Sequence, residues 1–288
     1  MDFRIKLKSY EKLIKFKVDI IVALTGVFGY FFGMGELDWT KILWLFLGGF
    51  FITGSAHIIN QIIERNFDKK MPRTSNRPLA LETMSLTEAV LMIVLFCSLG
   101  FYFLYEVNPL SAFVSFVSLI IYGFLYTPMK RLSRLSIYIG AIPGALPVLI
   151  GYLAAKGTID SFAILLFLMQ LFWQLPHSWS IAWYWYDDYT AGGYDLLPVK
   201  GGKNKINALL TFLSVFFLFP LIYMLYQLNV LHNFSLFIIL FLTIIFVYTA
   251  FLFYQKRNRQ AARTLMLSSI VYLPVIQLII IFNLLNNN

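Results

Sequence analysis

The sequence contains few charged residues and only one cysteine. Asp, Glu, Lys and Arg make up 13% of the 288 residues, about half the roughly 25% that soluble domains carry. A chain this long with so few charges cannot cover itself with a water-facing surface. Cys97 has no partner for an internal disulfide, and the Cys-rich spacings of structural zinc sites are missing. These shortages exclude a soluble domain, an internal disulfide and a zinc-stabilised fold.

Long apolar runs occupy most of the chain instead. Runs of about 20 apolar residues recur, which is the length that crosses roughly 30 Å of hydrocarbon as a helix. We therefore expect an all-α, polytopic membrane protein forming a single domain over residues 1–288. The nine expected spans are residues 16–34, 41–63, 86–105, 110–127, 137–155, 160–183, 207–227, 233–254 and 265–284.

Positive charge collects on alternate connectors between these spans. Of the 23 Lys and Arg residues, 21 lie in the N-terminal tail or in the loops after the second, fourth, sixth and eighth spans. Because positively charged loops stay in the cytoplasm, we expect the N-terminus inside and Asn286–Asn288 outside. The basic residues form short tracts and no basic helix face, so the net charge of +9 does not indicate a nucleic-acid partner.

The first acidic motif closes the second span. Asn60, Glu64 and Asp68 are spaced four residues apart, so they share one stripe of a helix. Their oxygens suit a hard cation such as Mg²⁺ that carries substrate phosphates. Arg73 and Arg77 follow, with fork-shaped donors that match phosphate oxygens. The alternative is that the two acids pair with nearby bases on a solvated helix end.

A second acidic motif closes the sixth span. Asp187 and Asp188 stand at its cytoplasmic end, before a Gly-Gly turn that leads to Lys203, and Asp195 is a weaker candidate. Two carboxylate clusters at one depth are what two metal ions bridging one diphosphate require. Together the two motifs predict a magnesium-dependent diphosphate site at the cytoplasmic edge.

His177 lies within the sixth span, three residues after Gln174. A lone membrane histidine is usually hydrogen-bonded in the core. Its place below the acids, with Gln174 nearby, equally favours contact with a substrate or a haem propionate. The tryptophans and tyrosines around it fit an aromatic belt at the membrane surface as well as they fit a substrate contact.

These segments resemble the UbiA superfamily of intramembrane prenyltransferases and, within it, the haem O synthase branch. The likeness runs in order over roughly residues 14–205. Its strings are Asn60-x-x-x-Glu64-x-x-x-Asp68, Met71-x-Arg73-Thr74-x-x-Arg77-Pro78-Leu79, Trp173-Gln174-x-Pro176-His177 and Asp188-Tyr189. The sequence departs from the superfamily at Glu64, where many members have Asp, and at Ala191, where the second motif usually has a second Asp.

The resemblance implies a helix bundle around a central cavity, in a bacterial-type inner membrane. It implies transfer of farnesyl from farnesyl diphosphate to a vinyl group of haem b, with Mg²⁺ as cofactor and haem as substrate. Membrane lipid and terminal-oxidase assembly proteins are the other implied partners. The implied metal ligands are Asn60, Glu64, Asp68 and Asp187 or Asp188, and the implied diphosphate ligands are Arg73, Arg77, Lys130 and Lys203.

Two other functions compete with this one. A relative in the same superfamily attaches prenyl chains to an aromatic acid or quinone precursor, and the Trp173–His177 string disfavours that acceptor only by resemblance. A secondary transporter also has many spans with acidic residues. Transporters, however, place such charges near the bilayer midplane in broken helices, whereas both acid clusters here lie at one edge beside arginines.

Overall fold

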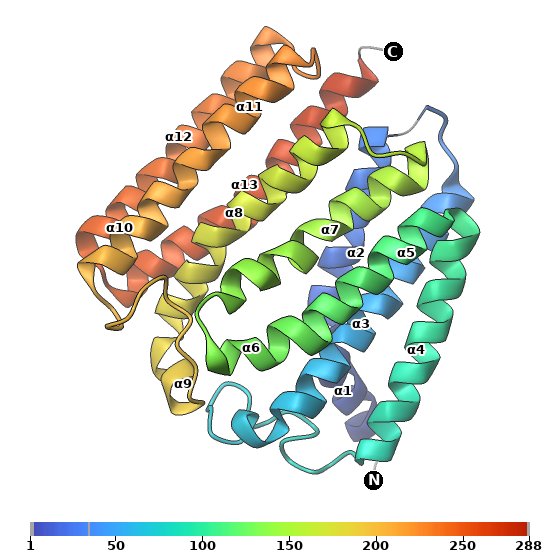
Figure 1. Ribbon diagram of the computed structural model, residues 1–288, viewed down its shortest axis with the longest axis vertical. Coiled ribbons are helices and arrows are strands. Elements are labelled where there is room, and N and C mark those ends of the chain that lie inside the picture. The colour runs from blue at the N-terminus through green and yellow to red at the C-terminus, as the bar shows by residue number, and fades with distance from the viewer. Residues whose placement is uncertain (1–2, 34, 287–288) are drawn as a thin grey trace.

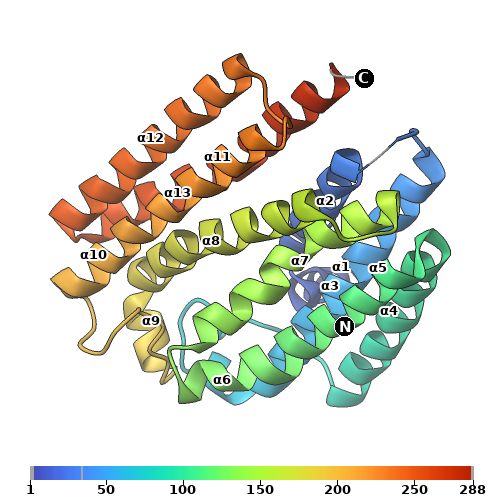
Figure 2. The same ribbon diagram turned by 45° about the horizontal axis from the view of Figure 1, so that its top comes forward.

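The protein is a bundle of long helices. The computed structural model describes residues 3–33 and 35–286, and every regular element within those ranges is helical. The helices are α1 (Phe3–Ile14), α2 (Phe16–Gly33), α3 (Trp39–Asp68), α4 (Leu86–Val107), α5 (Pro109–Ile120), η1 (Ile121–Tyr126), α6 (Thr127–Leu132), α7 (Ser136–Lys156), α8 (Ser161–Tyr184), α9 (Tyr186–Ala191), α10 (Lys205–Ser214), η2 (Val215–Phe217), α11 (Leu218–Gln227), α12 (Asn233–Lys256) and α13 (Arg259–Leu285). Figures 1 and 2 show the long helices lying alongside one another.

The expected spans coincide with these helices. Eight helical stretches in the described ranges are long and apolar enough to cross a membrane, two of them made of successive helices, Pro109–Leu132 and Lys205–Gln227. The remaining expected span, the sixth, at residues 160–183, corresponds to α8. This helix is equally long and packs against α7 and α13, but its glutamines, histidine and tryptophans make it less apolar.

The outer faces of the bundle are apolar. On α12, Phe234, Phe237, Phe241 and Ile244 follow one another at helical spacing and are all exposed. A row of large exposed apolar side chains would be a liability in water. Hydrocarbon is the solvent that suits it, so the fold is that of an integral membrane protein.

Helices α2 and α7 pack backbone to backbone. A Cβ atom added to Gly151 would lie 1.8 Å from the Gly26 carbonyl oxygen, and one on Gly29 would lie 2.1 Å from the Val148 oxygen. Pro147 stands inside α7 at the same contact. The glycine- and proline-rich stretch of this span therefore allows close helix approach.

Charged loops and short helices gather at one end of the bundle. Figure 1 shows α1, the end of α3 with its following loop, α6 and α9 together at the lower end, whereas α13 finishes at the upper end. Of the expected exterior C-terminal tail, only Asn286 lies within the described residues.

The amphipathic helix α1 was not expected, because the sequence of the N-terminal tail shows only a charged segment before the first span. It ends at Ile14, and Lys15, with a φ of 54°, separates α1 from α2.

Candidate active site

Three oxygen-bearing side chains line up on the last turns of α3. Asn60, Glu64 and Asp68 are 1%, 5% and 1% exposed, and all three border one cavity of about 120 Å³. The amide of Asn60 donates from Nδ2 to Thr127 Oγ1 at 3.2 Å. The stripe predicted from the spacing is therefore buried beside a cavity. This burial argues against the alternative of a solvated helix end.

Two bases hold the two carboxylates of this stripe. Lys130 of α6 places its Nζ 2.5 Å from Glu64 Oε1. Arg77, in the loop after α3, donates from Nη1 to both carboxylate oxygens of Asp68 at 2.8 Å. Carboxylates and cations thus alternate around the cavity. Such a set can receive an anion and a divalent cation together, because each partner finds opposite charge.

The second acidic motif reaches the first through Arg73. Its backbone N–H donates to Asp188 Oδ1 at 3.2 Å. Its guanidinium lies over the rings of Trp185 and Tyr189, 5.6 and 5.3 Å from their centroids. Asp188, which does not itself border the cavity, therefore joins α9 to the loop after α3. The aromatic residues here therefore contact an arginine of the site.

The other acids of the second motif point elsewhere. The side chain of Asp187 is 88% exposed, with Lys203 Nζ 3.6 Å away, and neither residue borders the cavity. Asp195 pairs with Arg134. In the part of the chain that the structure describes, no three acidic, histidine or cysteine side chains lie close enough together to hold a metal alone. Of the two expected alternatives, Asp187 and Asp188, the structure joins Asp188 to the loop of the first motif and leaves Asp187 exposed.

Tyrosines form much of the remaining wall. The residues Tyr122, Tyr126, Tyr189 and Tyr194 all border the cavity. Lys130 Nζ lies 5.0 Å from the ring centroid of Tyr126 and 5.8 Å from that of Tyr194. Burial and nearby Glu64 raise the pKa of Tyr194 well above its usual range, so this phenol stays neutral. Sequence reasoning quoted Tyr189 only as part of a resemblance and assigned none of the four to the site, because they are divided among η1, α9 and the loop after α9.

Lys15 is a further cavity residue that sequence reasoning missed. It stands at the break between α1 and α2 and borders the same cavity as Asp68. Burial and the neighbouring cations Arg77 and Lys130 lower the pKa of Lys15 to about 7. In the sequence, Lys15 is one of six bases in the N-terminal tail and looks like the others. In the structure, its left-handed backbone distinguishes it.

His177 and Gln174 lie on α8, away from the cavity. His177 Nδ1 is 2.7 Å from Ser269 Oγ of α13, and its ring stacks on Trp173 at 4.8 Å. Trp173 donates from Nε1 to the Ser269 carbonyl oxygen at 2.9 Å. This is the hydrogen-bonded core arrangement that was one of the two alternatives for His177. Gln174 packs against Gly144, and its Oε1 atom is buried without a hydrogen-bond partner.

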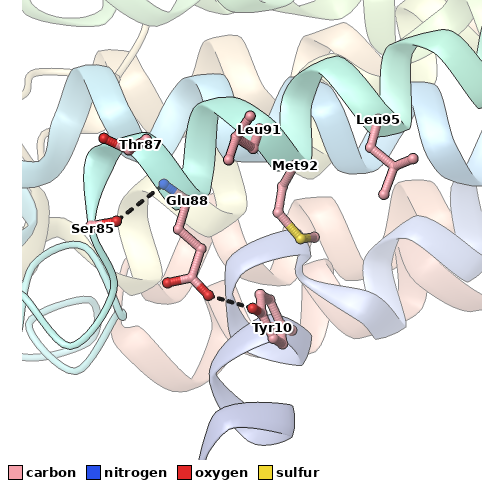
Figure 3. A pocket seen from close by; sticks show the side chains of 7 residues that line it. All are labelled: Tyr10, Ser85, Thr87, Glu88, Leu91, Met92 and Leu95. Carbon is pink, nitrogen blue, oxygen red and sulfur yellow. Dashed lines mark hydrogen bonds between the residues drawn. The ribbon is translucent and has the colours of Figure 1, made fainter.

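A second, larger hollow lies between α1 and α4 and has different chemistry. Its volume is about 430 Å³, and Figure 3 shows Leu91, Met92 and Leu95 along it. Its one carboxylate, Glu88, already accepts a hydrogen bond from Tyr10 and pairs with Lys6 Nζ at 3.2 Å. The hollow lacks the acid stripe and the arginines. The smaller cavity is therefore the candidate active site.

Comparison with known families agrees with this geometry. Residues 22–271 match the model of the UbiA prenyltransferase family. The chain belongs to this family. It is 37% identical over 273 residues to the protoheme IX farnesyltransferase of Cytophaga hutchinsonii, covering 94% of this chain and 96% of that protein. It is 34% identical over 281 residues to the protoheme IX farnesyltransferase of Christiangramia forsetii, covering 96% and 93%.

Solved structures of UbiA-type proteins share the fold. A digeranylgeranylglyceryl phosphate synthase superposes with a TM-score of 0.79 at 22% identity, over 96% of this chain and 98% of its own. A UbiA homologue from Archaeoglobus fulgidus, solved with GPP and Mg²⁺, superposes with a TM-score of 0.62 at 16% identity, over 94% and 99%. Family membership excludes the transporter, and the chain is a UbiA-type prenyltransferase.

Proposed function

We propose that this enzyme transfers farnesyl from farnesyl diphosphate to a vinyl group of haem b, forming haem O and diphosphate. The observation that carries the proposal is the buried Asn60, Glu64 and Asp68 stripe facing Lys130 and Arg77 across one cavity. The named activity of the relatives supports farnesyl as donor and haem as acceptor.

The cavity residues fit a magnesium ion. Asn60, Glu64 and Asp68 offer the amide and carboxylate oxygens that a hard cation prefers. Asp188 is the candidate ligand of the second motif, because Arg73 holds it beside the first. When bound with the substrate, Mg²⁺ supplies positive charge to neutralise the departing diphosphate.

The bases of the cavity bind the diphosphate. Arg73 and Arg77 match phosphate oxygens through paired N–H donors, and Lys130 adds a point charge. On binding, the anion competes with Glu64 and Asp68 for these cations. The positive charges stabilise the negative charge that develops when the C–O bond to the farnesyl group breaks.

The tyrosine rings surround the place where the allylic cation forms. The ring electrons of Tyr122, which borders the cavity, would attract this cation, whereas Tyr126 and Tyr189 already have Lys130 and Arg73 over their rings at 5.0 and 5.3 Å. Burial also limits the water that would quench the cation early. The π-electrons of the haem vinyl group then attack it and form a carbon–carbon bond. Water adds to the resulting cation and loses a proton, leaving a hydroxyethylfarnesyl chain.

We place the acceptor toward α8. Gln174 Oε1 is an acceptor without a hydrogen-bond partner in the described structure, so an O–H donor of the acceptor, such as a protonated propionate, would satisfy it. The ring of His177 is already hydrogen-bonded to Ser269, so we assign His177 a smaller part than Gln174 in binding the acceptor.

We also infer that the cavity end faces the cytoplasm of a bacterial-type inner membrane, since the basic loops lie at that end.

The choice of acceptor is tested with radiolabelled farnesyl diphosphate, Mg²⁺ and membranes containing the protein. Haem b, an aromatic acid and a quinone precursor are supplied together, and the labelled products are separated. Label on haem alone supports the proposal. Label on the aromatic acid or quinone precursor keeps prenyl transfer and overturns the acceptor.

A further inference from the structure

Asp19 and His57 form a buried polar pair inside the membrane domain. Asp19 is 0% exposed and His57 is 6% exposed, and His57 Nδ1 lies 2.5 Å from Asp19 Oδ1. The pair joins α2 to α3. Ionisable side chains buried in a membrane are costly and generally serve a function. Neither residue borders the active-site cavity, so the proposed chemistry does not use either one directly.

The pair lies against the last turn of α1. The same His57 Nδ1 is 3.2 Å from the carbonyl oxygen of Ile14. One turn further along α3, Gln61 donates from Nε2 to the carbonyl oxygens of Lys12 and Leu13, at 3.0 and 2.7 Å. The last carbonyls of a helix have no partner within that helix. Two side chains of α3 therefore cap the end of α1.

The capped break is where Lys15 stands. Its φ of 54° is unfavourable for a residue with a Cβ atom and persists only when its surroundings impose it. Ile14, immediately before it, is bound by His57. Asp19, in the first turn of α2 after it, holds the same histidine through its side chain, with Oδ1 2.5 Å from His57 Nδ1. The pair thus fixes the chain on both sides of Lys15.

We propose that Asp19 and His57 are positioning residues that hold the α1–α2 break so that the Lys15 ammonium group faces a diphosphate in the cavity. The ligand class is a diphosphate anion, either the end of a prenyl diphosphate or the released product. This choice of ligand rests on the proposed function. His57 also lies one turn before Asn60 on α3, so the same contact fixes the start of the acidic stripe.

The test measures the affinity of the detergent-solubilised full chain for inorganic diphosphate with Mg²⁺ by calorimetry. Lys15→Met removes one charged contact, so we expect diphosphate to bind about tenfold more weakly. His57→Leu should weaken binding to the same extent. His57→Asn, which keeps an N–H donor near the Ile14 oxygen, should restore most of it. The double variant of His57→Leu and Lys15→Met should bind no more weakly than Lys15→Met alone.

A matched control removes a buried polar contact far from the cavity. Thr243 Oγ1 lies 2.9 Å from the Tyr272 hydroxyl between α12 and α13, and Thr243→Val should leave diphosphate affinity unchanged. If His57→Leu does not fold, Asp19→Asn is compared with Lys15→Met in its place.

Unchanged affinity in the His57 and Asp19 variants, or losses that add to that of Lys15→Met, would overturn the positioning role. Binding that follows the expected pattern without farnesylation of haem would overturn the proposed function alone. A wild-type protein that binds no diphosphate would overturn both.

Discussion

At the residue scale, the two aspartates that follow α8 have different surroundings although they are neighbours in the sequence. Asp188 accepts a hydrogen bond from the Arg73 backbone, whereas Asp187 is exposed beside Lys203. We expect Asp188→Asn to lower kcat/KM for farnesyl diphosphate by about 100-fold, in the range seen when one group that stabilises developing charge is lost. Asp187→Asn, the matched control, should change it less than threefold, about the effect of a weak exposed ion pair. Initial rates of prenyl transfer measure both, and equal losses would contradict the assignment of Asp188.

The lowered pKa of Lys15 predicts a pH dependence. A lysine is cationic below its pKa and neutral above it, and burial with nearby cations brings the pKa of Lys15 to about 7. Its contribution to diphosphate binding should therefore be present below pH 7 and fade as the pH rises through this value. The pH profile of kcat/KM reports groups of the free enzyme. Lys15→Arg, which stays charged, should remove this decline, and an identical decline in that variant would assign it to another group.

Some residues of the site were predictable from the sequence and others were not, depending on whether a local sequence pattern identifies them. Asn60, Glu64, Asp68 and Arg77 were predictable because their spacing on one helix and its following loop carries the pattern. Lys15 was not, because its role depends on a backbone break that contacts from α3 impose. The orientation of Asp187 away from the cavity also depends on tertiary structure, since two adjacent acids look alike in a sequence.

At the element scale, the contact between α2 and α7 tolerates no added side chain. A Cβ atom on Gly151 would lie 1.8 Å from a backbone oxygen of α2, so Gly151→Ala must push two backbones apart. We expect this change to destabilise the protein by about 1–3 kcal/mol, as overpacking does. Gly35→Ala, where no atom lies within 4 Å, is the control and should be neutral. Thermal unfolding in detergent compares the two, and an unchanged midpoint for Gly151→Ala would contradict this packing.

The long helices were predictable and the short ones were not. Runs of about 20 apolar residues specify a span regardless of its neighbours, so all nine expected spans correspond to helices. Helix α3 continues to Asp68, five residues beyond the expected end at 63, because its last turns are buried against α1 and α6. The helices α1 and α9 and the π-helical turn η1 depend on such contacts, and hydropathy does not reveal them.

At the scale of the whole molecule, the distribution of positive charge predicts the orientation in the membrane. In a Cys97→Ser background, Lys70→Cys lies in the loop after α3 and Ile159→Cys in the loop between α7 and α8. Both positions are exposed. In intact cells, a membrane-impermeant thiol reagent should label the cysteine at 159 and reach the one at 70 only after permeabilisation. The reverse pattern would place the active-site end outside.

We propose that one cavity at the end of this bundle transfers farnesyl to haem. The most direct measurement is the mass of haem extracted after the purified protein is incubated with haem b, farnesyl diphosphate and Mg²⁺. We expect a product heavier than haem b by a farnesyl group plus a hydroxyl group, absent for Asp68→Asn and absent when EDTA removes the metal. Unmodified haem from a folded wild-type protein, or the same product from Asp68→Asn, would contradict it.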